Sequence, residues 1–333
     1  MVLPGNQAHP QRGGSAACTA IGINPAGWLS YLGSRVLHMS RHTPSRPVDV
    51  ESLFPELLPF RRESVRLHPR SGSPMCEDSS VGGPLLWPAA EPWPVCEEEH
   101  YGLDDMNQPA PSVPMVPVVQ VRRADAPSVP FPEGTDLLQV LWCPYGHGEF
   151  CYPLPQVHWR DSSAVGDVLP TPLPAAELPE DWYPAPCAVH PEQVTEYPSR
   201  DLPDGVHDAL DGRFDELLAE TGLRYSYHLA EAPGIKLGGY PGWTQDPVWP
   251  DCEGCGSQME HLLTVSSWEF DGESWRTWLP EEDRADENES GGPRWKEDAH
   301  NPAGLCLGDA GGVYVFECRT CPDRPIGHWF DCS

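Results

Sequence analysis

The hydrophobic pattern predicts two buried strands and one helix at well-separated places along the chain. Apolar residues fill 115–121 and 136–143, which are rich in Val and Leu and bounded by Pro and Gly, as buried strands commonly are. From Asp204 to Gly222 the apolar residues recur at helical spacing: Val206, Leu210, Phe214, Leu217 and Leu218. Asp204 stands where a helix cap belongs, and Gly222 stands where a helix commonly ends. We expect the stripe to face the core, and the fold to be a β-rich α+β fold with one clear amphipathic helix.

Two shorter segments also have readable patterns. Hydrophobic and polar residues mix through 267–275 around Asp271-Gly272, a pair that is typical of a two-residue hairpin turn. We therefore predict a β-hairpin there. Residues 39–70 contain short apolar groups, which predict a short helix leading into a strand.

A fifteen-residue pattern occurs twice, 156 positions apart. Residues 82–96 read GGPLLWPAAEPWPVC and residues 238–252 read GGYPGWTQDPVWPDC, so both glycines, both tryptophans, a proline and the last cysteine coincide. The match continues loosely beyond the pattern. Met115-x-x-Val118 in the first copy corresponds to Met259-x-x-Leu262 in the second, and Val140-x-x-Cys143 corresponds to Val315-x-x-Cys318. Arrays of short repeats need about three units to bury a core. Two copies instead predict an internally duplicated, pseudo-twofold fold of two similar antiparallel β half-domains.

The repeat suggests how the chain is organised. We assign 39–160 to the first half-repeat, 161–203 to a proline-rich connection over the surface, and 204–333 to the helix plus the second half-repeat, with 39–333 as one compact unit. Residues 1–38 contain no Asp or Glu, and Asn24-Pro25 interrupts their only apolar stretch. We expect this segment to be disordered or an over-extended start, with a weak targeting segment as the alternative.

The charge balance excludes some partners. Acidic residues outnumber basic residues 50 to 21, which gives a formal charge of −29. Such a charge repels nucleic acid and anionic membranes, and it attracts basic proteins. The alternative interpretation is solubility alone. No stretch of the sequence approaches the ~20 apolar residues of a membrane span, so we expect no membrane partner and a cytoplasmic location.

Four cysteines form two pairs with metal-ligand spacing, Cys252-x-x-Cys255 and Cys318-x-x-Cys321. Two such turns that face each other complete a tetrahedral zinc site, closed to water and therefore structural. The residues between the pairs outnumber the ~15–20 of a common zinc ribbon, but the repeat places both pairs at neighbouring strand ends. The alternatives are four buried free thiols, or a redox disulfide at one pair.

The repeat alignment predicts a second site in the first half. There the matching cysteines are each followed by a histidine, in the pairs Cys96-x3-His100 and Cys143-x3-His147. If the halves share a fold, these four residues converge on a Cys2His2 zinc site, with Cys151 as a spare ligand. The alternative is that both histidines are exposed loop residues.

The quoted motifs carry a family resemblance. The segment GGYPGWTQDPVWPDCEGCGSQMEHLLTV, followed by GDAGGVYVFECRTCPDRP, resembles the YwqG-like family of bacterial proteins, domain-of-unknown-function family 1963. The first half's GGPLLWP and DLLQVLWCP resemble the other half of that family, so the likeness covers about 80–333. More distantly, the pattern is similar to programmed cell death protein 2 and its yeast relative, which escort a basic ribosomal protein. The resemblance implies a duplicated β-rich fold and leaves the biochemical role open.

No motif in the sequence identifies a catalytic residue. Signatures of nucleophilic hydrolases, metalloproteases and phosphate-binding loops are missing from the chain. From the charge and the cysteine pairs we expect a cytoplasmic, acidic, zinc-stabilised protein that binds a basic protein or peptide without catalysis, and the resemblance implies an escort-like or immunity-like role. The alternative is an enzyme whose site lies in the cleft between the two halves.

Overall fold

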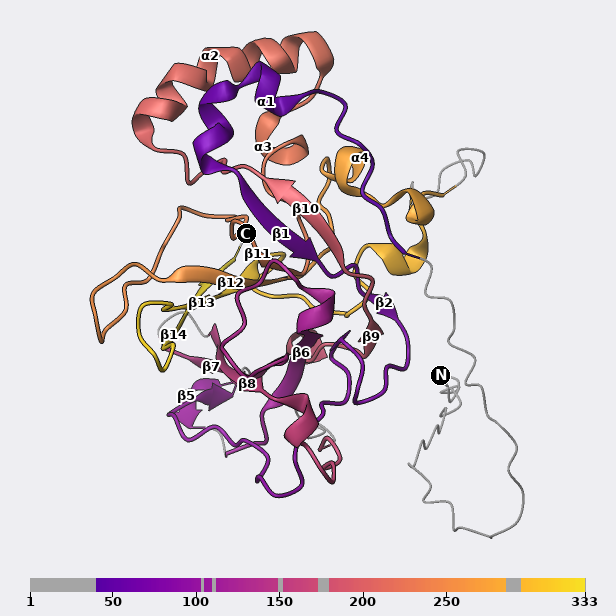
Figure 1. The fold of residues 1–333 in the computed structure, drawn as a ribbon, viewed down its shortest axis with the longest axis vertical. Helices are drawn as coiled ribbons and strands as arrows, with labels where there is room; N and C mark the ends of the chain where they lie inside the picture. Colours follow the sequence, from indigo (N-terminus) through magenta and orange to yellow (C-terminus); the bar gives the residue numbers. More distant parts are fainter. Residues whose placement is uncertain are drawn as a thin grey trace, which may run out of the picture. The chain divides into compact units, whose positions relative to one another are not determined.

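In a computed structural model of the chain (Figure 1), the described residues belong to one compact unit, Met39–Ser333. The predictions for residues 1–38 and for Cys151 lie outside the described residues. The structure describes residues 40–102, 105–109, 112–148, 152–172, 180–285 and 295–332.

Two antiparallel sheets form the body of this unit, so the prediction of a β-rich α+β fold is confirmed. The first sheet has the strand order β10 (Glu192–Glu196), β1 (Arg62–Arg66), β11 (Lys236–Gly238), β12 (Glu260–Ser266), β13 (Gly312–Glu317) and β14 (Ile326–Asp331). The second sheet begins with β2 (Arg70–Ser71), β9 (Cys187–Ala188), β3 (Ser80–Val81), β6 (Val116–Arg122) and β7 (Leu137–His147). Strand β7 also pairs with β8 (Tyr152–Arg160) and, near its end, with β4 (Tyr101–Gly102), which pairs with β5 (Asp105–Pro109).

The two repeats exchange one strand each. Strand β1 precedes the first repeat in sequence, yet it lies between β10 and β11 in the sheet of the second repeat. Strand β9 precedes the second repeat, yet it lies between β2 and β3 in the sheet of the first. The segment 161–203, predicted as a surface connection without strands, contains both β9 and β10. Because β1 and β9 each pair with strands of the repeat other than the one they precede, the two halves form one interlocked unit.

Hydrogen bonds at equivalent positions support the duplication. The Met115 N–H donates to the Pro94 carbonyl at 2.9 Å, and the Met259 N–H donates to the Pro250 carbonyl at 2.8 Å. The register of β6 with β7 shifts after Pro117, and that of β12 with β13 shifts after His261 at the matching position. A shared bulge and shared loop bonds indicate the same local fold in both halves.

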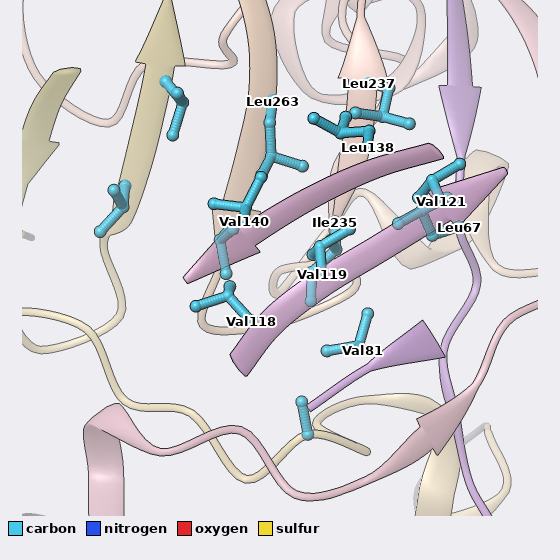
Figure 2. Close-up of a cluster of buried hydrophobic side chains, with 14 of the residues drawn as sticks. Leu67, Val81, Val118, Val119, Val121, Leu138, Val140, Ile235, Leu237 and Leu263 are labelled. Carbon is cyan, nitrogen blue, oxygen red and sulfur yellow. The ribbon is translucent and has the colours of Figure 1, made fainter. Parts of the chain in front are cut away.

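The core lies between the two sheets. Figure 2 shows side chains of both in one cluster, with Leu237 and Leu263 from the first sheet beside Val119, Val140 and Leu138 from the second. All five are fully buried. All of β7 and all but the last residue of β6 are buried, so both faces of these two strands are covered, which explains why they are rich in Val and Leu on both faces.

The main helix packs outside the sheets. Figure 1 shows α2 (Asp204–Thr221) beside α1 (Val50–Leu53) and α3 (Tyr225–His228), with the 3-10 turn η1 (Pro55–Phe60) following α1. The helix ends as predicted at Gly222, which has a φ of +69°. Two details of the prediction are wrong: the cap position is Pro203 rather than Asp204, and Leu218 is exposed rather than part of the buried stripe.

The predicted hairpin at 267–275 is wrong. The Asp271 carboxylate accepts hydrogen bonds from the backbone N–H groups of Glu273 and Ser274, at 3.1 and 2.8 Å. An Asp side chain that bonds the backbone two and three residues ahead favours a helical turn over a strand. The chain therefore enters the short helix α4 (Trp275–Trp278). The other short 3-10 turns are η2 (Arg123–Asp125), η3 (Ser162–Ala164), η4 (Glu180–Trp182), η5 (Glu281–Asp283) and η6 (Glu297–Ala299).

Candidate metal centres and an acidic groove

The first half brings its four predicted ligands together. One ligand atom from each of Cys96, His100, Cys143 and His147 lies within 4.8 Å of the other three, and all four residues are buried. Cys96 Sγ is 3.3 Å from His147 Nε2, and Cys143 Sγ is 3.8 Å from His100 Nδ1. The interpretation of these histidines as exposed loop residues is therefore wrong. The cluster could hold a metal ion.

Backbone carbonyls orient His147 as they do in many metal sites. Its Nδ1 lies 2.9 Å from the Tyr145 carbonyl and 3.3 Å from the Tyr152 carbonyl, so the proton sits on Nδ1 and the Nε2 lone pair faces Cys96. Such a bond fixes the tautomer and the ring plane of a ligating histidine. Burial lowers the pKa of His147 and therefore favours the neutral imidazole that a metal requires.

Burial also shapes the thiols of this centre. It raises the pKa of Cys143 to about 12, because a thiolate there is removed from water and lies beside Cys96. A thiol of this kind is inert until a positive charge stabilises its anion. A cation among the four ligands would supply that charge, since a coordinated thiol loses its proton.

The second half brings together its own four predicted ligands. The sulfur atoms of Cys252, Cys255, Cys318 and Cys321 all lie within 4.8 Å of one another. Two contacts connect the two Cys-x-x-Cys turns: Cys252 Sγ to Cys321 Sγ at 3.8 Å and Cys255 Sγ to Cys318 Sγ at 3.6 Å. This cluster could also hold a metal ion.

Local backbone geometry builds each of these turns. Gly256 has a φ of +71°, a conformation that favours glycine, and its N–H donates to the Cys252 carbonyl at 2.7 Å. In the other turn the Cys321 N–H donates to Cys318 Sγ at 3.4 Å. Hydrogen bonds from Ser257, and then from neighbouring thiols, lower the pKa of Cys255 to about 6. The turns therefore aim their sulfurs at one point and favour a thiolate there.

The two centres occupy equivalent places in the repeat. The Cys96 N–H donates to the Val113 carbonyl, and the Cys252 N–H donates to the Ser257 carbonyl. These bonds close a long loop in the first half, which contains β4 and β5, and a tight turn in the second. The longer loop gives the first centre His100 where the second has Cys255. The equivalence explains why a repeat alignment could find a site that has no common motif.

One half-buried carboxylate, Asp201, holds the repeat's two tryptophans in the second half, and no sequence motif points to it. The indole N–H groups of Trp243 and Trp249 both donate to Asp201, at 3.0 and 2.6 Å to the nearer oxygen. Burial raises the pKa of Asp201, although both indole bonds oppose that shift. The two tryptophans recur in the repeat, but nothing in the sequence links them to a residue about 40 positions upstream. Asp201 therefore belongs to the fold rather than to a reactive site.

A groove of about 690 Å³ runs beside α2. Three exposed helix carboxylates, Asp204, Asp208 and Asp215, line one wall. The apolar part of the lining comes from Leu202, Phe214, Leu218, Tyr225 and Pro247. Phe214 stacks on Tyr225 with ring centroids 4.1 Å apart, which makes this part rigid. The groove therefore combines a firm apolar surface with a negative wall.

Two cations, Arg200 and Arg224, also line the groove, and each has a partner. Arg213 of α2 bonds Glu56 of η1, and Arg200 lies 4.0 Å from Asp246 of the same lining. Arg224 lies over the Tyr227 ring. In the described ranges, none of the three helix carboxylates forms an ion pair. They therefore keep their full negative charge for a partner.

A second cavity of about 430 Å³ is lined by β1, β11 and β12 of the first sheet and by residues 128–130 of the first half, so it bears on the enzyme alternative. His261 lines it, but Nδ1 and Nε2 of its ring contact the Gly238 carbonyl and Thr264 Oγ1, at 2.8 and 3.0 Å. Arg319 also lines it, and its guanidinium binds Glu317 and Glu260. These groups are engaged in structural contacts, so the cavity supports the enzyme alternative less than the groove supports binding.

No family model matches this chain, and no curated protein matches it either. Among the described residues, none of the helices has both the length and the apolar character that a membrane crossing requires.

Proposed function

We propose that this protein is an acidic, zinc-stabilised binding protein whose partner is a basic protein or peptide. The observation that carries the proposal is the row of unpaired carboxylates beside the apolar part of the α2 groove. A cytoplasmic location and membership of the YwqG-like family belong to the same proposal. An escort-like or immunity-like role would follow from that membership.

The ligand sets favour zinc in both centres. A tetrahedral zinc with Zn–S bonds of about 2.3 Å places its sulfurs about 3.8 Å apart, and mixed sulfur and nitrogen ligands about 3.5 Å apart. The contacts of 3.8 and 3.6 Å in the second centre, and of 3.3 and 3.8 Å in the first, agree with these spacings. Thiolates with imidazoles select zinc over hard cations such as magnesium. Both centres are closed sets of four, which is typical of structural zinc.

Repulsion between the aspartates on its acidic face lowers the stability of helix α2. Asp204, Asp208, Asp211 and Asp215 follow one another at spacings of four, three and four residues. Like charges at these spacings destabilise a helix by a few tenths of a kcal/mol per pair. A face that repels itself becomes favourable when a cationic partner neutralises it. This supports a binding role for the groove over solubility alone.

The expected occupant is a basic segment with an apolar anchor. Lysine or arginine side chains would meet the carboxylates, while a leucine or aromatic side chain would lie against Phe214 and Tyr225. Because the three carboxylates are exposed, they would act chiefly on the association rate, and salt would weaken their effect. The overall charge of −29 would add to the same attraction.

A labelled peptide tests the proposal. We would titrate full-length protein with a fluorescein-labelled fourteen-residue peptide of alternating arginine and leucine, at about 0.03 and 0.3 M salt. Asp204→Asn, Asp208→Asn and Asp215→Asn together should weaken binding at least about tenfold. The matched control is Glu77→Gln, Glu133→Gln and Asp167→Asn, which removes the same charge from exposed positions elsewhere. Equal losses in both variants would leave only a general charge effect and contradict the groove as the site.

Affinity capture from the native host would identify the natural partner. A stoichiometric basic protein that elutes with salt supports the proposal. A small molecule that stays bound through purification supports the enzyme alternative instead.

A further inference from the structure

The two centres differ in how far water and solutes can reach them. All four ligands of the first centre are buried, and the most exposed, His147, shows 4% of its surface. In the second centre Cys252 and Cys318 are buried, Cys321 is half-buried and Cys255 is exposed. A reagent in solution therefore meets one sulfur of the second centre directly, and none of the first.

We propose that the four-cysteine centre is a site of oxidative modification, at which a peroxide converts its ligands into two disulfides while the Cys2His2 centre keeps its ligands. The inference goes beyond the binding role and rests on the zinc part of the proposed function. Cys255 is the entry point because it is the exposed ligand, and thiolate exposure governs where oxidation begins.

The chemistry needs two molecules of hydrogen peroxide. The Cys255 sulfur attacks one peroxide oxygen, the O–O bond breaks, and hydroxide leaves and takes up a proton to become water. The sulfenic acid formed on Cys255 then lies next to Cys318, whose sulfur is 3.6 Å away. Cys318 attacks it, an S–S bond forms, and a second hydroxide leaves as water. Two thiolates, one peroxide and two protons thus give one disulfide and two waters.

The remaining sulfurs follow the same course. Cys252 and Cys321, 3.8 Å apart, react with the second peroxide in the same way. A disulfide sulfur is not a thiolate ligand, so the cation leaves as the bonds form. The geometry also fixes the connectivity, because both short contacts join one Cys-x-x-Cys turn to the other.

Cross-linking should preserve the fold of the second half. The disulfides Cys255–Cys318 and Cys252–Cys321 would tie the ends of the same two strands that the zinc tied, and they would close long loops. Chelation removes the zinc without adding a bond, so it removes folding energy outright. Oxidised, zinc-free protein should therefore melt well above chelated, reduced protein.

The test uses full-length protein with its zinc measured before any oxidant is added. Hydrogen peroxide is added at a few molar equivalents, released zinc is followed with a chromogenic chelator, and disulfides are mapped by mass spectrometry of peptides. We expect one zinc equivalent to leave, with Cys255–Cys318 and Cys252–Cys321 as the mapped pairs. The first centre should lose its zinc at least about tenfold more slowly.

Controls separate this site from other thiols. Cys332→Ser removes an exposed cysteine outside both centres and should leave zinc release unchanged. His147→Ala removes the first centre and should still release one equivalent on oxidation. Oxidation of Cys96 and Cys143 at the same rate as Cys255, or disulfides within each turn, would overturn the proposal. So would peroxide that leaves the zinc in place. Absence of zinc before oxidation would instead overturn the zinc part of the proposed function.

Discussion

Lys236 and Glu196 form an ion pair across β1, the exchanged strand. Lys236 Nζ lies 2.8 Å from Glu196 Oε1, and neither side chain is exposed. They belong to β11 and β10, with β1 between them. Glu196 also accepts the backbone N–H groups of Ala232 and Tyr240, so its charge is well supported. The pair therefore holds the exchanged strand from both sides.

Removing one partner of this pair should be costly. Lys236→Met leaves Glu196 buried without its cation, and breaking a buried pair in this way costs about 3–5 kcal/mol. Lys236→Met combined with Glu196→Gln removes both charges and should recover part of that loss. Urea unfolding followed by tryptophan fluorescence measures both. A single variant that unfolds like the wild type would contradict the role given to the pair.

Two glycine substitutions should act in opposite directions. Gly212 lies in the middle of α2, and a Cβ added there would meet nothing within 4 Å. Gly212→Ala should stabilise the protein by roughly 0.5–1 kcal/mol, because alanine has the higher helix propensity. Gly239 has a φ of +64°, and a Cβ there would collide with the Glu196 carboxylate. Gly239→Ala should therefore destabilise the protein, and unfolding free energies of the two variants give the comparison.

Acid should destabilise the fold through His261. Burial, and then the charge of Lys236, lowers the pKa of His261 to about 3, whereas an unfolded histidine titrates near 6.5. The unfolded chain therefore binds a proton that the folded chain refuses, so the stability contribution is complete above pH 6.5 and is lost as the pH falls toward 3. Unfolding free energy measured from pH 7 to pH 4 should fall less steeply in His261→Gln than in the wild type. Parallel slopes would contradict this.

The positions of the metal ligands could be predicted from the sequence, whereas the order of the strands in the sheets could not. All eight predicted ligands converge in the structure because Cys-x-x-Cys spacing and the repeat each impose strong local constraints. Strand β9 has two residues, Cys187 and Ala188, and so short a strand has no periodicity to read. One sequence feature reflects the strand exchange: a His-Pro pair follows each exchanged strand. It is His68-Pro69 between β1 and β2, and His190-Pro191 between β9 and β10. Two residues carry too little information to identify a repeat without the structure.

The hairpin prediction at 267–275 is wrong for a different reason. Asp271-Gly272 suits a hairpin turn, but the Asp271 carboxylate accepts the N–H groups two and three residues ahead. The buried Glu269 accepts the Ile235 N–H at 3.0 Å. A long-range bond of this kind cannot be read from local pattern. The exposure of Leu218 could not be predicted from local pattern either, because this side chain lines the groove beside α2.

Metal content should report the two centres independently. Wild-type protein never exposed to chelator should contain two zinc equivalents by elemental analysis. Cys255→Ser removes one ligand of the second centre and should leave one equivalent, and His147→Ala should likewise leave only the second centre's zinc. The double variant should contain none. His207→Ala changes an exposed histidine of α2 outside both centres and should keep two equivalents.

Loss of either zinc should lower the stability of the whole unit, because the exchanged strands β1 and β9 join the halves. Thermal unfolding of Cys255→Ser and of His147→Ala should therefore shift as a single transition rather than split into two. The first centre should also empty at higher pH than the second, because protons compete with zinc for imidazole ligands, whereas thiolate ligands alone hold the other zinc. Zinc measured after dialysis at stepwise lower pH tests this order. A value of one equivalent that survives His147→Ala and vanishes in Cys255→Ser would place zinc in the second half alone.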